Sequence, residues 1–142
     1  MDYARGIEVL ASLYGDKRDR LGKLALLHPL EVAEQLDPDD ADGRIVALFH
    51  DALEDGFATD LDDIPGASDE TRDAIWILTR DDRETYSDYI ARVRDAGGVG
   101  GEIARRVKFA DLAVNFARCI ELEDGDGLRL RYARALRELA PT

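Results

Sequence analysis

Apolar residues recur every three or four positions along most of this chain, and this periodicity limits its fold more than any other feature. Ile7, Leu10, Ala11 and Tyr14 give the first example, because these positions share one face of a helix that Gly15 is expected to end. The same pattern predicts helices over residues 29–36, 39–55, 69–79, 85–96, 102–119 and 128–139. No segment carries a hairpin signal. We therefore expect an all-α fold, a compact bundle in which short connections pack neighbouring helices together.

Two glycine-rich segments interrupt the predicted helices. Residues 97–101 hold four glycines around Val99 and are expected to form a flexible break, too short to link two domains. Residues 124–127, with the sequence Asp-Gly-Asp-Gly, are expected to form a turn. A length of 142 residues is typical of one domain, so a single domain over residues 1–142 is predicted.

The charge balance excludes several classes of partner. The chain has 31 acidic and 19 basic residues, which gives a formal net charge of −12. A nucleic-acid polymer or an anionic membrane surface needs a basic footprint, whereas a small phosphorylated ligand responds only to local charge. The single cysteine, Cys119, excludes an intrachain disulfide, and the sequence has neither a signal-peptide pattern nor 18 uninterrupted apolar residues. A cytoplasmic protein is expected, and the sequence does not indicate its oligomeric state.

Candidate chemistry is concentrated around the chain's two histidines, His28 and His50. If residues 39–55 are helical, His50, Asp51, Glu54 and Asp55 crowd the end of one helix, because side chains four residues apart are neighbours. The residues beside them are apolar. Carboxylates held together next to an apolar core repel one another and are costly unless a cation is present.

A further acidic residue, Asp111, lies inside an apolar helical stretch. Asn115 follows one turn later and Lys108 precedes it by almost one turn. Aspartate is unfavourable in the middle of a helix, so Asp111 is expected to have a partner. A core histidine bonded to the backbone and an aspartate that caps a neighbouring helix are the alternatives for single residues. Taken together, two imidazoles and two carboxylates suit a divalent metal such as manganese, iron or zinc.

These residues resemble those of the HD-domain metal-dependent phosphohydrolases, and in particular the hydrolase domain of the Rel/SpoT alarmone enzymes and their small stand-alone relatives. The most specific match is the stretch from His50 to Asp55, His-Asp-x-x-Glu-Asp, with an upstream His-Pro pair at His28. The other matching segments are residues 28–33, 47–56, 77–80, 84–90 and 107–115, in the family's order. The resemblance covers roughly residues 3 to 120.

The resemblance implies an all-helical domain of the HD type with one divalent metal, typically Mn²⁺, with Fe²⁺ or Zn²⁺ as alternatives. Its implied metal ligands are His28, His50, Asp51 and Asp111, and its implied catalytic pair is Glu54 and Asp55, beside the attacking water. The implied activity is removal of the 3′-pyrophosphate from (p)ppGpp-like alarmones. The implied substrate contacts are Arg20 and Asn115, together with Lys108, for which a solvated or ligand-supporting lysine is the alternative.

Two departures from the family pattern keep other functions open. Residues 23–27 lack the Pro-Tyr pair that often precedes His-Pro, and residues 112–114 lack the basic residue that often follows the last aspartate. A phosphatase of another phosphorylated nucleotide or dinucleotide, such as NADPH, is therefore an alternative. A non-catalytic nucleotide-binding HD module is another, although the sequence has lost neither a ligand nor the acidic pair.

Overall fold

Capping side chains in the sequence set where several helices begin. In the computed structural model, which describes residues 1–119 and 125–141, Asp2, Asp40, Ser68 and Thr85 each accept a hydrogen bond from the backbone N–H three residues further on. They begin α1 (Tyr3–Tyr14), α3 (Ala41–Phe49), α4 (Asp69–Leu78) and α5 (Tyr86–Asp95). The other elements are α2 (Leu27–Gln35), the 3₁₀ turn η1 (Leu61–Asp63), α6 (Gly98–Arg118) and α7 (Gly125–Leu139). No β-strand occurs in the described residues, and the predicted all-α fold is confirmed.

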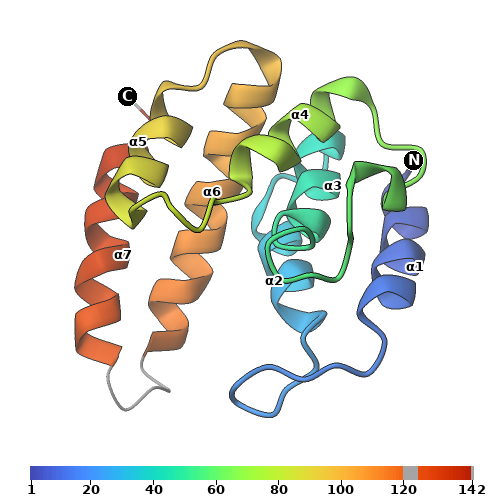
Figure 1. The fold of residues 1–142 in the computed structure, drawn as a ribbon, viewed down its shortest axis with the longest axis horizontal. Coiled ribbons are helices and arrows are strands. Elements are labelled where there is room, and N and C mark those ends of the chain that lie inside the picture. The colour runs from blue at the N-terminus through green and yellow to red at the C-terminus, as the bar shows by residue number, and fades with distance from the viewer. Residues whose placement is uncertain (120–124, 142) are drawn as a thin grey trace.

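Helix α6 is the centre of the bundle. It packs against α2, α3, α4, α5 and α7, and Figure 1 shows α5 and α7 on one side of it and α1 to α4 on the other. Ile103, Val107 and Leu112 on α6 are at most 1% exposed. Asp111 lies in this buried stretch at 2% exposure, so a charged side chain points into the middle of the domain.

The predicted helix over residues 39–55 is wrong in its second half, because α3 ends at Phe49 and residues 50–56 form turns. The Ala52 N–H bonds to the Phe49 carbonyl, three residues back, and Gly56 has a φ of 78°. Successive side chains diverge by about 100° on a regular helix, so His50 and Asp51 can converge only where the helical path is left. The change from the i→i−4 to an i→i−3 hydrogen bond after Phe49 is the local reason for the early end of α3.

The predicted flexible break over residues 97–101 is also wrong, because α6 begins at Gly98. A Cβ atom on Gly100 would overlap the Asp73 carboxylate, and one on Gly101 would overlap the Ala96 carbonyl. These glycines therefore permit close packing of α6 against its neighbours. The turn predicted over residues 124–127 falls partly outside the described residues, and Gly125 to Gly127 form the first turn of α7.

The remaining helix predictions agree with the structure to within a few residues. The segment predicted over 29–36 spans 27–35, and the one predicted over 85–96 spans 86–95. The final helix begins three residues before the predicted position 128 and ends at Leu139 as expected. Among the helices in the described ranges, none has both the length and the apolar character needed to cross a membrane.

Candidate metal centre

Four side chains from distant parts of the sequence meet at one point beside α6. His28 lies in the first turn of α2, His50 directly follows α3, Asp51 begins the next turn, and Asp111 lies in the middle of α6. One donor atom from each of these side chains lies within 4.8 Å of the donor atoms of the other three. The four residues suggested as metal ligands by the sequence are therefore brought together by the fold.

The distances within this cluster fit a single divalent cation. Asp111 Oδ1 lies 2.8 Å from His28 Nε2 and 3.2 Å from His50 Nε2. Asp51 Oδ2 lies 3.1 Å from His50 Nε2 and 3.7 Å from His28 Nε2. Ligands about 2.1 Å from a metal and at right angles to one another are separated by about 3 Å. A pair of imidazole nitrogens with a pair of carboxylate oxygens is a donor set that suits manganese, iron or zinc.

The orientation of His50 is set by the backbone of its own helix. Its Nδ1 lies 2.6 Å from the Ala47 carbonyl oxygen, so the Nδ1–H donates to that carbonyl and Nε2 faces Asp51 and Asp111 in the cluster. Metal-binding histidines in proteins have this second hydrogen bond almost without exception, because it fixes the tautomer and the ring plane. His50 is thus prepared for coordination through Nε2.

Two side chains of its own helix, Lys108 and Asn115, stabilise Asp111 as an ionised carboxylate. Lys108 Nζ lies 2.8 Å from Asp111 Oδ2, and Asn115 Nδ2 donates to Oδ1 at 3.1 Å. Burial opposes ionisation of Asp111, but Lys108 and His50 hold its pKa well below the usual value. In the same way, burial opposes the imidazolium of His50, but Asp51 and Asp111 raise the pKa of His50 well above its usual value. The metal-free cluster therefore retains a proton that a bound cation would displace.

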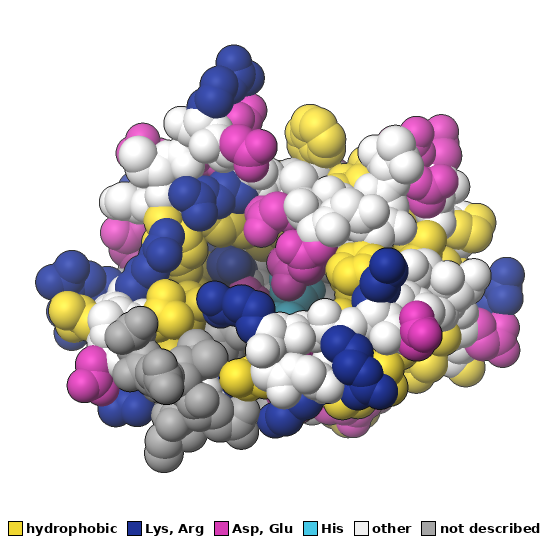
Figure 2. Space-filling view, turned by 60° about the horizontal axis from the view of Figure 1, so that its bottom comes forward, with side chains coloured by type: hydrophobic (Ala, Val, Ile, Leu, Met, Phe, Trp, Pro, Cys, Tyr) yellow, Lys and Arg dark blue, Asp and Glu magenta, His cyan; other side chains and the backbone are white. Residues whose placement is uncertain are grey.

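The cluster opens onto a cavity of about 250 Å³. His28 and Asp51 line this cavity, together with Asp55, Asn115 and Arg20. Figure 2 shows histidine at the bottom of a hollow, next to acidic side chains and with basic side chains around it. Arg20 and Asn115, two of the predicted substrate contacts, therefore line the cavity that a small molecule bound at the cluster would occupy.

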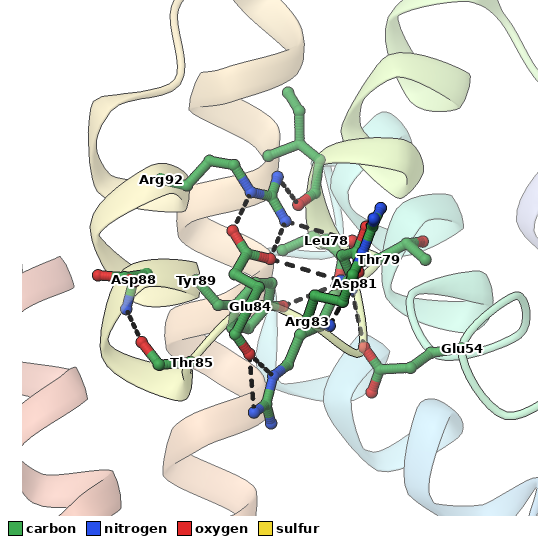
Figure 3. A network of polar contacts seen from close by, with 12 residues as sticks. Glu54, Leu78, Thr79, Asp81, Arg83, Glu84, Thr85, Asp88, Tyr89 and Arg92 are labelled. Atoms are coloured by element: carbon green, nitrogen blue, oxygen red, sulfur yellow. Dashed lines mark hydrogen bonds and ion pairs between the residues drawn. The ribbon is translucent and has the colours of Figure 1, made fainter.

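The acidic pair that follows the His-Asp motif is divided between two faces of the turn. Asp55 lines the cavity, and its partial burial together with the charges of Asp51 and Glu54 raises the pKa of Asp55 to about 6. Glu54 instead accepts a hydrogen bond of 2.9 Å from the Arg80 backbone N–H in the segment between α4 and α5. Figure 3 shows Glu54 reaching from its turn toward this segment. Of the two predicted catalytic residues, Asp55 alone is on the cavity wall.

Lys108 lies beneath the cluster rather than on the cavity wall. It is 9% exposed, and its Nζ lies 5.2 Å from the centre of the Tyr89 ring as well as against Asp111. Burial opposes its charge, but Asp111 raises the pKa of Lys108 well above its usual value. The position of Lys108 is the one expected of a lysine that supports a ligand, not of a solvated one.

Sequence reasoning missed two features around the site. The first is Arg118, which lines the cavity and lies on the same face of α6 as Asp111 and Asn115. Its spacing of seven residues from Asp111 could have shown this, because positions i, i+4 and i+7 share a helix face.

The second feature is the group of side chains in Figure 3 that holds the segment after α4, in which Arg92 pairs with Glu84 at 2.7 Å. No short-range pattern indicated that group.

Comparison with known proteins adds no relative from which residue roles could be transferred. No protein-family model matches the sequence, and no curated protein matches it significantly. The converging side chains are accordingly the observation from which a function is inferred.

Proposed function

We propose that this protein is a metal-dependent phosphohydrolase of the HD type that acts on a small phosphorylated nucleotide. The observation that carries this proposal is the convergence of His28, His50, Asp51 and Asp111 at the bottom of a cavity. The best single candidate for the reaction is removal of the 3′-pyrophosphate from a (p)ppGpp-like alarmone. The metal that we propose is Mn²⁺, with Fe²⁺ or Zn²⁺ as alternatives of similar ligand preference.

Each residue of the cluster has a definable part in this reaction. The two histidines would bind the cation through Nε2 and the two aspartates through a carboxylate oxygen. When bound, the cation supplies Lewis acidity, which activates water as a nucleophile and polarises a phosphoryl oxygen. Lys108 and Asn115 hold Asp111 in place through its two carboxylate oxygens.

Asp55 is the residue that we propose as the general base. Its carboxylate lines the cavity next to Asp51 and His28, which would hold the cation, and this is the place from which a general base could take the proton of the attacking water. It would accept the proton of the attacking water while the bond between phosphorus and the 3′-oxygen breaks. The products are pyrophosphate and a nucleotide with a free 3′-hydroxyl, which takes up a proton.

The size of the cavity supports a nucleotide that enters by its phosphorylated end. About 250 Å³ lies below the roughly 300–1,000 Å³ of pockets that enclose a drug-sized ligand. The nucleobase of the substrate would then lie at the mouth of the cavity, where Arg20 is exposed. In a protein with a net charge of −12, an anionic substrate depends on local cations such as the metal and Arg20.

The decisive experiment measures metal content and product release on the same preparations. Protein loaded with Mn²⁺ is incubated with a panel of (p)ppGpp, NADPH and other phosphorylated nucleotides, and released pyrophosphate and phosphate are quantified. We expect pyrophosphate release from the alarmone, and loss of both metal and activity in His28→Gln. The matched control is Glu31→Gln, which changes an exposed side chain of the same helix and is expected to keep both.

Three outcomes would contradict the proposal or a part of it. Nucleotide binding without product in metal-loaded protein would favour a non-catalytic binding module. A clear preference for NADPH would keep the phosphohydrolase but reject the alarmone as its substrate. Equal metal content in the wild type and in His28→Gln would reject the metal site itself.

A further inference from the structure

Arg118 is a basic side chain in the cavity that the proposed reaction does not use. Besides Arg20, it is the only lysine or arginine among the described residues that line this cavity, whose other charged side chains are mainly aspartates. It lies seven residues after Asp111 on α6, which places it about 10 Å further along the helix axis. The cavity therefore has a positive group well separated from the cluster that would hold the metal.

The guanidinium of Arg118 uses only some of its hydrogen-bond donors within the described residues. Its NH2 group donates to Asp19 Oδ2 at 2.9 Å, and the side chains of the two residues are 23% and 25% exposed. Within the described residues, its Nε and NH1 groups have no hydrogen-bond acceptor. An arginine in this state retains donors in a planar arrangement that matches two oxygens of a phosphate.

Asp19 is fixed in its loop independently of Arg118. Its Oδ1 accepts hydrogen bonds from the backbone N–H groups of Leu21 and Lys23 at 2.9 and 3.0 Å. The backbone of Asp19 also donates to the Lys23 carbonyl, and a β-bridge joins Arg18 to Leu24 beside it. Asp19 therefore holds Arg118 at the cavity without depending on it for its own position.

We propose that Arg118 determines substrate specificity by binding a second phosphate group, about two helical turns from the group that is hydrolysed. Asp19 orients the guanidinium and competes with that phosphate for it. This inference rests on the proposed function and adds to it the residue that would distinguish a nucleotide with phosphate groups at two separate positions from one with a single phosphorylated position. A nucleotide with a single phosphorylated position would leave Arg118 paired with Asp19 alone.

The first test measures anion binding without catalysis. Inorganic pyrophosphate is titrated into metal-free protein by calorimetry, with wild type, Arg118→Gln and Asp19→Asn compared. We expect Arg118→Gln to weaken binding about tenfold, as for loss of charge-assisted hydrogen bonds, and Asp19→Asn to strengthen it several-fold. The asparagine retains a side-chain oxygen for the Leu21 and Lys23 N–H groups, so the loop is expected to stay folded.

The opposite signs of these two effects separate the proposal from a structural ion pair. If the Asp19–Arg118 pair only stabilises the loop, both variants change binding in the same direction, and that result would overturn the proposal. Should Arg118→Gln prove unstable in thermal unfolding, Arg118→Lys keeps the positive charge and tests the loss of the planar donors. Binding by Arg118→Lys equal to that of the wild type would then count against a phosphate contact of this geometry.

The second test measures specificity with two substrates in the Mn²⁺-loaded protein. The ratio of kcat/KM for guanosine 3′,5′-bisdiphosphate to that for guanosine 3′-diphosphate is expected to exceed one and to fall about tenfold in Arg118→Gln. An unchanged ratio would reject the second phosphate contact. If the wild type hydrolyses neither nucleotide, the proposed function fails, whereas the pyrophosphate titration still decides the role of Arg118.

Discussion

The bottom of the cavity and its mouth are built in different ways. At the bottom, His50 and Asp111 are 2% exposed, and each has hydrogen bonds that fix its side chain. At the mouth, Asp55 and Arg20 are exposed and belong to turns rather than helices. The comparison teaches that the candidate metal ligands include buried, mutually dependent groups, whereas the proposed general base and the predicted substrate contact Arg20 are groups that solvent reaches.

The largest change in the free energy of unfolding is expected for a substitution at the bottom of the cavity. Asp111→Ala leaves Lys108 buried without its ion-pair partner, and such a loss destabilises a protein by about 3 kcal/mol. Urea unfolding of the metal-free protein measures this change. The double variant Asp111→Ala/Lys108→Met removes the orphaned charge and is expected to recover most of the lost stability. No recovery in the double variant would mean that Lys108 is not held by Asp111.

Metal binding is expected to give the next largest effect. A cation at a hundredfold excess over its Kd stabilises the folded state by about 2.7 kcal/mol. For a domain of this size, that corresponds to a rise in Tm of about 5 °C or more, measured when Mn²⁺ is added to chelator-treated protein. The rise should be absent in His50→Ala and retained in Glu31→Gln. The same rise in His50→Ala would place the bound metal elsewhere.

At the mouth, Asp55 is expected to have a smaller effect that depends on pH. Its pKa is raised to about 6 in the folded protein from an ordinary value of 3.8, so the folded state binds the proton more tightly than the unfolded state. Its stabilising contribution is therefore complete below pH 4 and is lost as the pH rises through 6. Asp55→Asn should accordingly stabilise the metal-free protein at pH 7, by about 1 kcal/mol after solvent screening.

Unfolding curves at pH 4 and pH 7 test this prediction for Asp55. The gain in stability of Asp55→Asn over the wild type should shrink toward zero at pH 4, where the wild-type carboxyl is protonated in the folded state. A variant that is less stable than the wild type at pH 7 would show that the Asp55 carboxylate is favourably paired, contrary to the arrangement described above.

The smallest effect is expected at Glu54, which joins the turn of the site to the segment after α4. Glu54→Ala removes the acceptor of the Arg80 N–H and should lower the free energy of unfolding by about 0.5–1 kcal/mol. Glu54→Gln keeps a carbonyl oxygen at this position and should change stability less. If instead both variants abolish product release to the same extent, Glu54 acts through its charge in catalysis.

The sequence was a good guide to the helices and to the four residues of the candidate metal cluster for a shared reason. Helix periodicity and capping residues such as Ser68 and Thr85 are local, and the His-Asp motif lies next to the helix that presents it. The inference of one site from His28 and Asp111, 83 residues apart, succeeded because each is a polar residue that an apolar helix can carry only with a partner.

The division of the acidic pair could not be predicted from local patterns. On a continuous helix, Glu54 lies beside His50, but the tightened turn after Phe49 and the positive φ of Gly56 direct Glu54 toward Arg80. Arg80 presents its N–H there because the segment after α4 is held by contacts with α5. Such an arrangement depends on long-range packing, which no short stretch of sequence records.

The glycine pair at the start of α6 affects the position of Asp111 in the candidate metal centre. A Cβ atom on Gly101 would overlap the Ala96 carbonyl and one on Gly100 would overlap the Asp73 carboxylate, so the start of α6 packs closely against both residues. Asp111 lies ten residues beyond Gly101, so a slip of one residue would carry it about 1.5 Å along the axis and about 100° around it. Ligand atoms must be placed to within about 0.5 Å for a working site. A packing contact about 15 Å away thus helps to set the position of Asp111, one of the four residues that could hold a metal.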